Sequence, residues 1–209
     1  MKQYDIKNIR TIAVMGHHGS GKTSFMESVL YVTGAKEKKG SVEAGTTTSD
    51  FLTEEKSHET SMSTSLIPVE YNGYKFNFLD TPGNKELANE DRQALSVVKG
   101  AVLVIDGSKG IDINTEQVLE DLSERNIPTI IYVNKMDKEG ADPDRVKNEM
   151  AAKDVIPEDW GGDVQFVNVS AHTGEGIDTL LDAVLLQAEM LELMAAKNVP
   201  AKGVVVESS

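Results

Sequence analysis

The residues of this chain that are best suited to chemistry form a loop at positions 16–23, Gly-His-His-Gly-Ser-Gly-Lys-Thr. The pattern G-x-x-x-x-G-K-[ST] lies here between a β-branched apolar run at 11–15 and a helical segment from Thr23, the context of a phosphate-binding loop rather than of a glycine-rich turn without a ligand. The glycines let backbone N–H groups converge, and the helix adds its positive N-terminal end. The pattern predicts that Lys22 contacts the β- and γ-phosphates of a nucleotide and that Thr23 ligates Mg²⁺. The residues expected to hold the phosphates are Gly16, His17, His18, Gly19, Ser20, Gly21, Lys22, Thr23 and Ser24.

A second motif, Asp80-Thr81-Pro82-Gly83, follows a predicted strand at 74–79. A carboxylate at a strand end can hold a water of the Mg²⁺ shell, and we expect this of Asp80. The turn that follows leaves a bare backbone N–H on Gly83, which we expect to meet the γ-phosphate. Such turns are common, so the motif gains its meaning from its place after the phosphate loop.

The motif Asn134-Lys135-Met136-Asp137 indicates which base is bound. One ionised carboxylate, that of Asp137, can accept both the N1–H and the exocyclic amine of guanine, whereas adenine has no such donor pair. A site built for that pairing rejects the analogue by about 10⁴- to 10⁵-fold. Ser170-Ala171-His172, after the next strand, is expected to direct a backbone N–H to the guanine oxygen. An ordinary polar strand exit is the alternative for Asn134–Asp137 taken alone, but the order of the motifs favours a guanine site.

Strand and helix patterns alternate along the chain, as the positions of these motifs require. Strands are predicted at 11–15, 65–71, 74–79, 101–105, 128–133 and 164–169, and helices at 23–32, 86–98, 114–125, 142–152 and 176–194. Asn72-Gly73 predicts a hairpin that makes the second strand antiparallel to the third. The sequence therefore predicts an α/β fold, with a mostly parallel six-stranded sheet, one antiparallel hairpin strand, and helices on both faces. The motifs should converge at the carboxyl ends of the strands.

The polar segment 33–64 shows no sustained periodicity, and a loop of this length is functional or disordered. We expect it to become ordered when a nucleotide binds. Its basic cluster of Lys36, Lys38 and Lys39 has glutamates nearby, which is typical of a solvated loop.

Composition limits the class of protein. The chain has 209 residues, no cysteine, 39% hydrophobic residues and a formal net charge of -13. These values predict one globular domain, without disulfides or thiolate metal sites, and disfavour a broad nucleic-acid-binding surface. The first residues lack an apolar signal core, and no apolar run reaches the roughly 18 residues of a membrane span. We expect a cytoplasmic monomer with no membrane partner.

In these motifs the chain resembles the GTP-binding domains of translation-factor GTPases. Residues 1 to about 138 resemble elongation factor G and its elongation-factor-G-like relatives, in positions 45–51, 80–83 and 133–137. Residues from about 140 onward resemble bacterial initiation factor 2, in positions 141–146, 157–163 and 185–189. The resemblance implies a P-loop NTPase G domain over residues 1–197, with a tail at 198–209 that is similar to the start of a following barrel domain. It also implies GTP or GDP and Mg²⁺ as ligands and the ribosome as a partner. We interpret the two resemblances as an engineered chimera joined within residues 134–137, with a natural divergent protein as the alternative.

Three positions differ from the usual pattern of that family. Asn84 replaces the histidine that positions the attacking water, Gly19 replaces an acidic residue in the phosphate loop, and Ser61 replaces the magnesium-binding threonine. The resemblance thus implies catalysis by Lys22, Gly83 and Asn84, and metal binding by Thr23, Ser61 and Asp80. Because asparagine does not titrate near neutral pH, we predict slow hydrolysis of GTP. The alternatives are a guanine-nucleotide-binding module with negligible turnover, a recombined chain without a biological role, and, disfavoured by Asp137, an ATP-using phosphotransferase.

Overall fold

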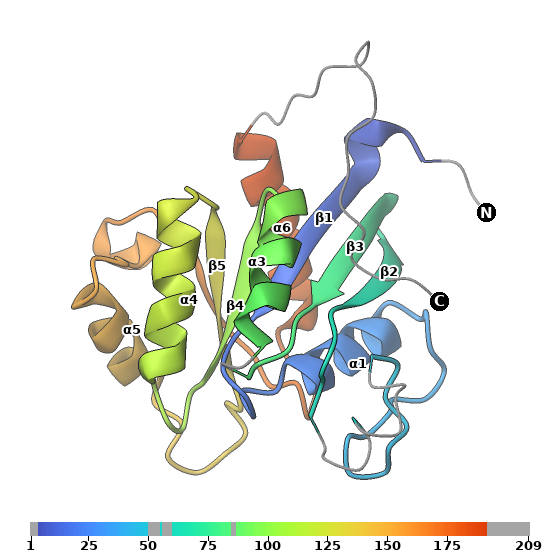
Figure 1. The fold of residues 1–209 in the computed structure, drawn as a ribbon, viewed down its shortest axis with the longest axis horizontal. Coiled ribbons are helices and arrows are strands. Elements are labelled where there is room, and N and C mark those ends of the chain that lie inside the picture. The colour runs from blue at the N-terminus through green and yellow to red at the C-terminus, as the bar shows by residue number, and fades with distance from the viewer. Residues whose placement is uncertain (1–3, 50–54, 56–59, 85–86, 192–209) are drawn as a thin grey trace.

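The computed structural model describes residues 4–49, 55, 60–84 and 87–191, and shows a six-stranded sheet between two layers of helices (Figure 1). The strands are β1 (Ile9–Met15), β2 (Ser65–Tyr71), β3 (Tyr74–Asp80), β4 (Ala101–Asp106), β5 (Thr129–Asn134) and β6 (Phe166–Asn168). The α-helices are α1 (Lys22–Val32), α3 (Ala88–Val97), α4 (Ile113–Glu124), α5 (Pro143–Ala151) and α6 (Ile177–Met190). The predicted fold class is thereby confirmed.

The strands lie in the order β2-β3-β1-β4-β5-β6, and every neighbouring pair is parallel except β2 and β3. The antiparallel pair is joined by Asn72 and Gly73, whose φ angles are 47° and 82°. Both residues adopt the left-handed conformation that a two-residue hairpin turn requires, and asparagine and glycine tolerate it best. The predicted hairpin is confirmed, and it places β3 directly beside β1.

Each face of the sheet packs against its own helices. On one face, Phe25, Met26 and Val29 of α1 and Leu180 and Leu181 of α6 are buried against the strands. On the other face the apolar side chains come from α3, α4 and α5, and they are Ala94, Leu95, Leu122, Val146 and Met150. All six residues of β4 are buried, as the continuous apolar run predicts for a central strand.

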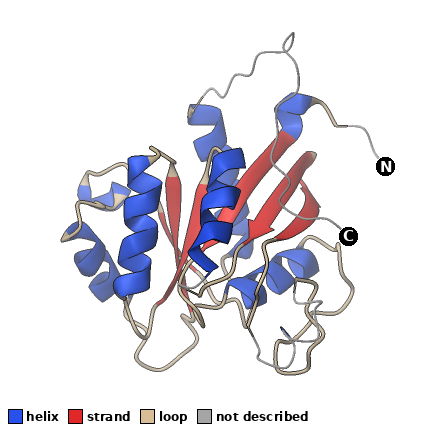
Figure 2. Cartoon of the chain, viewed as in Figure 1, coloured by secondary structure: helices blue, strands red, loops and turns tan. Residues whose placement is uncertain are grey.

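The loops that follow the parallel strands gather at one edge of the molecule, the lower edge in Figure 2. The predicted element bounds agree with the structure to within a few residues. Two short 3-10 helices, Ile6–Asn8 and Glu158–Trp160, were not predicted, because three-residue elements carry no periodicity. Residues 192–194 of the last predicted helix and the predicted tail at 198–209 lie outside the described residues. Among the described helices, none combines the length and the hydropathy that a bilayer crossing needs.

Candidate nucleotide-binding site

The phosphate loop passes from β1 to the first residue of α1 through backbone that only glycine can adopt. Gly16 has φ 146°, and a Cβ added there would lie 2.4 Å from the carbonyl oxygen of Val104 in β4. Gly21 has φ 98°, and its Cβ would lie 2.3 Å from Nδ2 of Asn134. Glycine at these two positions therefore allows the loop to pack directly against β4 and against the strand end that carries Asn134. Gly19 also has a positive φ, of 78°, which accounts for glycine at this position.

Lys22 is buried, and its ammonium group turns back onto the loop. Nζ donates to the carbonyl oxygen of Gly16 at 2.8 Å and to that of His17 at 3.2 Å. The turn after β3 lies against the same atoms, because a Cβ added to Gly83 would lie 2.5 Å from Nζ of Lys22 and 2.7 Å from the His18 nitrogen. The structure therefore brings the predicted catalytic residues Lys22 and Gly83 together. The next residue, Asn84, is exposed.

The three predicted metal ligands come from α1, β3 and the long loop. The hydroxyl oxygens of Thr23 and Ser61 lie 3.3 Å apart although 38 positions separate the two residues. Two neighbouring ligands of an octahedral Mg²⁺, each at about 2.1 Å, lie about 3 Å from one another. The third predicted ligand, Asp80, is a carboxylate at the end of β3 and is 1% exposed. Hydroxyl and carboxylate oxygens form a donor set that suits a hard cation, so these residues fit magnesium.

Asn134, at the end of β5, connects the predicted base site to the phosphate loop. Its Nδ2 donates to the carbonyl oxygen of Ser20 at 2.9 Å. Its Oδ1 accepts from the backbone N–H of Ala171 at 3.0 Å and from the hydroxyl of Tyr132 at 3.2 Å. Asn134 is 1% exposed, so the loss of any of these bonds would leave a buried polar group unsatisfied. One amide thus fixes two loops that lie far apart in the sequence.

Asp137 lies beside the loop at 170–172, as the predicted guanine site requires. Its Oδ1 accepts from the Ser170 hydroxyl at 2.6 Å, and its Oδ2 is 3.9 Å from Nδ1 of His172. The hydrogen bond from Ser170 lowers the pKa of the Asp137 carboxyl below its ordinary value. The carboxylate is therefore held in the ionised form, which is the form that accepts two hydrogen bonds from one base. The His172 side chain itself is 85% exposed.

Lys135 completes the connection between the motifs. Its Nζ donates to the carbonyl oxygen of Gly19 at 2.6 Å and to Oδ2 of Asp106, at the end of β4, at 2.6 Å. Burial raises the pKa of Asp106, but hydrogen bonds from Lys135 and Ser108 outweigh that effect and hold it below the ordinary value. Asp106 was not identified from the sequence, although its place at a strand end was a usable signal.

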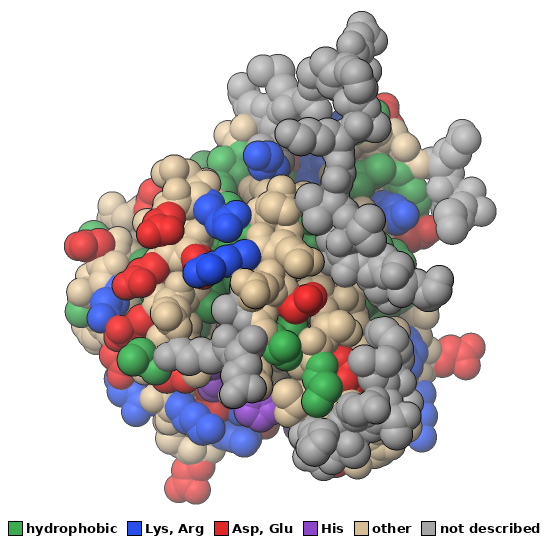
Figure 3. Space-filling view, in the orientation of Figure 1, with side chains coloured by type: hydrophobic (Ala, Val, Ile, Leu, Met, Phe, Trp, Pro, Cys, Tyr) green, Lys and Arg blue, Asp and Glu red, His purple; other side chains and the backbone are tan. Residues whose placement is uncertain are grey.

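A cavity of about 670 Å³ lies at the carboxyl edge of the sheet, beside Asn134 and Asp137. Its lining includes Gly21 and Ser24, which were predicted to hold the phosphates, and the predicted base-site residues Asn134, Lys135, Asp137, Ala171 and His172. Lys39, Gly40, Ser41, Val42 and Glu43 of the long loop also line it. In the space-filling view, histidine and lysine side chains gather at this lower edge (Figure 3).

The prediction of a solvated lysine cluster in the long loop was wrong for two of its members. Lys36 Nζ donates to the Glu27 carboxylate of α1 at 2.7 Å, and Lys39 Nζ donates to the carbonyl oxygens of Ala171 and His172. Glu27, which is 1% exposed, also accepts from backbone N–H groups of the loop. Sequence reasoning missed Glu27, because a single glutamate in a helix is most often solvated.

Two further ionisable groups on the phosphate side, His17 and Asp91, have shifted pKa values. Burial lowers the pKa of His17, whose Nδ1 is 2.6 Å from the carbonyl oxygen of His18, so the ring is neutral near neutral pH. Burial raises the pKa of Asp91, in α3, to about 6, and the negative charges of Asp121 and Glu90 act in the same direction. A hydrogen bond with Thr81 and the charge of Lys22 oppose that rise only in part.

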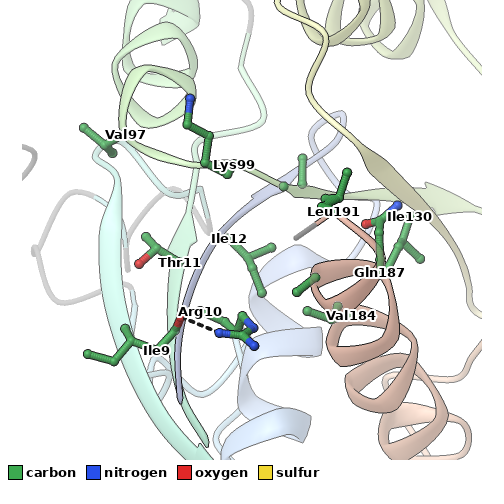
Figure 4. A pocket seen from close by; sticks show the side chains of 13 residues that line it. Ile9, Arg10, Thr11, Ile12, Val97, Lys99, Ile130, Val184, Gln187 and Leu191 are labelled. Atoms are coloured by element: carbon green, nitrogen blue, oxygen red, sulfur yellow. Dashed lines mark hydrogen bonds between the residues drawn. The ribbon is translucent and has the colours of Figure 1, made fainter. Parts of the chain in front are cut away.

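A separate hollow of about 220 Å³ lies at the opposite edge of the sheet, between β1, β4 and α6 (Figure 4). Ile12, Ile130 and Val184 form much of its floor. Arg10 lies at this hollow, and its guanidinium donates to the carbonyl oxygens of Lys7 and Ile9 and stacks over Tyr74 at 5.0 Å. None of the predicted phosphate or base residues lines it, so the cavity at the carboxyl edge is the candidate site.

Comparison with known proteins identifies the family of the chain. A family model described as the elongation factor Tu GTP-binding domain matches residues 7–190. Translation initiation factor IF-2 of Alcanivorax borkumensis is 44% identical over 197 residues, which are 94% of this chain and 20% of that protein. Translation initiation factor IF-2 of Clostridium tetani is 38% identical over 203 residues, which are 97% of this chain and 27% of that protein. The chain thus spans between a fifth and about a quarter of the length of these relatives.

Solved structures share the fold. A protein from Thermus thermophilus superposes with a TM-score of 0.68 and 36% identity, covering 71% of this chain and 22% of that one. A bacterial selenocysteine-specific elongation factor superposes with a TM-score of 0.68 over 90% of this chain and 30% of that one. Its identity is 21%, so it bears on the fold alone. The relatives named IF-2 match across residue 138 without a change of partner, and no comparison supports a join of two sources there.

Proposed function

The chain belongs to the family of elongation factor Tu GTP-binding domains, and we propose that it binds GTP and GDP with Mg²⁺ and hydrolyses GTP slowly as the switch domain of a translation factor. The observation that carries this proposal is the hydrogen-bonded connection from Ser20 through Asn134 to Ala171. It ties the phosphate loop directly to the guanine-type base site.

Within the base site Asp137 accepts the N1–H and the exocyclic amine of guanine, with its charge maintained by Ser170. The Ala171 N–H is already donated to Asn134, so the N–H of His172 is the donor that we assign to the guanine oxygen. This assignment refines the prediction for residues 170–172, which named the segment and not the atom. It also explains why an exposed histidine side chain is acceptable at this position.

At the other end, Lys22 leaves the carbonyl oxygens of Gly16 and His17 and donates to the β- and γ-phosphates. Thr23, Ser61 and Asp80 are the residues that would hold a magnesium ion, directly or through water. The ion neutralises charge on the phosphate oxygens when it is bound.

Hydrolysis is an in-line attack of water on the γ-phosphorus, with cleavage of the bond to the bridging oxygen and release of GDP and phosphate. Lys22 and the N–H of Gly83 stabilise the charge on the transferred group. Asn84 orients the water through hydrogen bonds and takes up no proton, so turnover is slow.

Calorimetric titration with Mg²⁺–GDP and, in parallel, Mg²⁺–ADP tests the binding proposal. We expect micromolar or tighter GDP binding and no measurable ADP binding. Equal binding of the two, or none in a folded protein, would overturn it. A single-turnover assay with GTP then separates a slow GTPase from a guanine-nucleotide-binding module without turnover, the alternative that Asn84 favours.

The relatives named translation initiation factor IF-2 support a role in translation initiation, and ribosome association follows from that proposal. Co-sedimentation with ribosomes in the presence of a non-hydrolysable GTP analogue tests it. A cytoplasmic, monomeric state stays a prediction that light scattering checks in part. The origin of the two parts of the chain from different factors also stays a prediction, now without support from the comparisons.

A further inference from the structure

The carboxylate of Glu27, which is buried in α1, holds a loop that none of the nucleotide motifs includes. Glu27 lies one turn after the phosphate loop, on the side of the helix that faces residues 36–48. Its Oε2 accepts from the Lys36 ammonium at 2.7 Å and from the Gly40 N–H at 2.7 Å. Its Oε1 accepts from the Thr48 N–H at 2.6 Å. A single side chain thus holds both ends of this loop.

The path of this loop leaves little room for adjustment. A Cβ added at Gly40 would lie 2.4 Å from the Thr46 carbonyl oxygen and 2.6 Å from Oε2 of Glu27. The Lys36 ammonium, besides its contact with Glu27, donates to the same Thr46 oxygen at 3.2 Å. The loop is therefore closed on itself around the carboxylate, and its position depends on that acceptor.

The held loop is also a wall of the nucleotide pocket. Residues 39–43 line the same cavity as Asn134 and Asp137. From this wall Lys39 reaches across to donate to the carbonyl oxygens of Ala171 and His172. Those carbonyls belong to the segment whose N–H we assign to the guanine oxygen. The chain of contacts thus runs from Glu27 through the loop to the base site.

We propose that Glu27 is a positioning residue of the guanine-nucleotide pocket, which holds residues 36–48 as a wall over the bound nucleotide and thereby sets the rate at which the nucleotide leaves. The inference rests on the proposed function, since it requires that guanine nucleotide occupies this cavity. It assigns to Glu27 no contact with the nucleotide. This role is separate from the predicted metal binding by Ser61, which belongs to the phosphate half of the site.

Replacing the Glu27 carboxylate by an amide tests this role, because the change keeps the shape of the side chain and alters only its hydrogen bonding. Both oxygens of Glu27 accept from N–H donors, so the isosteric Glu27→Gln must place its own NH₂ group against Lys36 and Gly40 or against Thr48. Gly40→Ala disturbs the same loop from its other side without altering α1. Glu37→Gln is the matched control, because it makes the same chemical change in the same loop at an exposed position.

The measurement is the release of a fluorescent GDP analogue, chased with excess GDP in the presence of Mg²⁺, from the full chain. A charge-assisted hydrogen bond contributes enough that we expect Glu27→Gln and Gly40→Ala to release the analogue roughly 10- to 100-fold faster. Glu37→Gln should stay within about twofold of the parent. All variants should keep the preference for GDP over ADP and an association rate within about threefold of the parent, since the Asn134 and Asp137 contacts are unchanged.

Release at the parent rate from both folded variants would overturn the inference while leaving the proposed function in place. A loss of the preference for GDP in Glu27→Gln would also overturn it, because that result would show general damage to the site. Should Glu27→Gln fail to fold by circular dichroism, Gly40→Ala decides. A folded parent protein that does not bind the GDP analogue would overturn the proposed function, and this inference with it.

Discussion

The base half and the phosphate half of the candidate site differ in how their charged groups are satisfied. In the base half, Asp137 and Asp106 receive hydrogen bonds from Ser170 and Lys135, and the pKa values of both carboxyls lie below the ordinary range. In the phosphate half, burial raises the pKa of Asp91 to about 6, and Lys22 donates to carbonyl oxygens of its own loop.

The two halves therefore depend on different partners. The base half is held together by hydrogen bonds within the protein, which fix its geometry. The Lys22 ammonium of the phosphate half contacts oxygens of its own loop, and we propose phosphate oxygens as its partners when a nucleotide is bound. We therefore expect changes in the base half to alter which nucleotide binds, and changes in the phosphate half to alter turnover and stability.

The largest expected effect belongs to Asp137→Asn. The amide retains one oxygen acceptor but places an NH₂ group against a guanine donor, so we expect the affinity for GDP to fall about 10⁴-fold. Xanthosine diphosphate, which has a carbonyl in place of the exocyclic amine, should gain affinity. Competition titrations with the two nucleotides measure this. An unchanged affinity for GDP would show that the base lies elsewhere.

The substitution Asn84→His tests the phosphate half of the site. If the slow rate results from a missing positioning group, the single-turnover rate of GTP hydrolysis should rise by about 10² to 10⁴. Asn84 is exposed and does not line the cavity around Asp137, so the affinity for GDP should stay within about threefold. A variant that hydrolyses GTP no faster than the parent, with binding intact, would refute our explanation of the slow rate.

What could be predicted from the sequence follows another division, that between local patterns and contacts that are distant in the sequence. The order of strands and helices, the hairpin at Asn72-Gly73 and the motifs at 16–23 and 134–137 are local patterns, and each carries its own geometry. The contacts of Glu27 with Gly40 and Thr48 are not local, because they depend on how the long loop folds back onto α1. The prediction for Lys36 and Lys39 failed for the same reason, because their partners are distant in the sequence.

Asp91→Asn should change stability with a particular pH dependence. The pKa of Asp91 in the folded protein, about 6, is above the unfolded value of 3.8, so the folded state retains a proton that the unfolded state releases. This contribution to the free energy of unfolding is complete below about pH 4 and is lost as pH rises through 6. Removing the ionisation should stabilise the variant relative to the parent by about 2 to 3 kcal/mol at pH 8, with little difference at pH 4.

Urea unfolding of the two proteins at pH 4 and at pH 8 measures this difference directly. The comparison uses parent minus variant, because other carboxyls, such as Glu27 and Asp106, have lowered pKa values and contribute with the opposite sign. A stability difference between the proteins that is the same at both pH values would show that Asp91 is not the titrating group.

The smallest expected effect is that of Ser170→Ala, which separates the hydrogen bond to the Asp137 carboxylate from the position of the loop at 170–172. Ser170→Ala removes the donor to Oδ1 of Asp137 and should weaken GDP binding about tenfold at pH 7. Because that hydrogen bond lowers the pKa of Asp137, the variant should also lose GDP binding at a higher pH than the parent as pH falls.

Ser28→Ala is the matched control: its hydroxyl donates to the carbonyl oxygen of Ala171 in the same loop and does not contact Asp137. If both variants weaken binding with the same pH profile, the loop position and not the charge of Asp137 governs the base half. If only Ser170→Ala shifts the pH dependence of GDP binding, the ionised form of Asp137 governs binding in the base half.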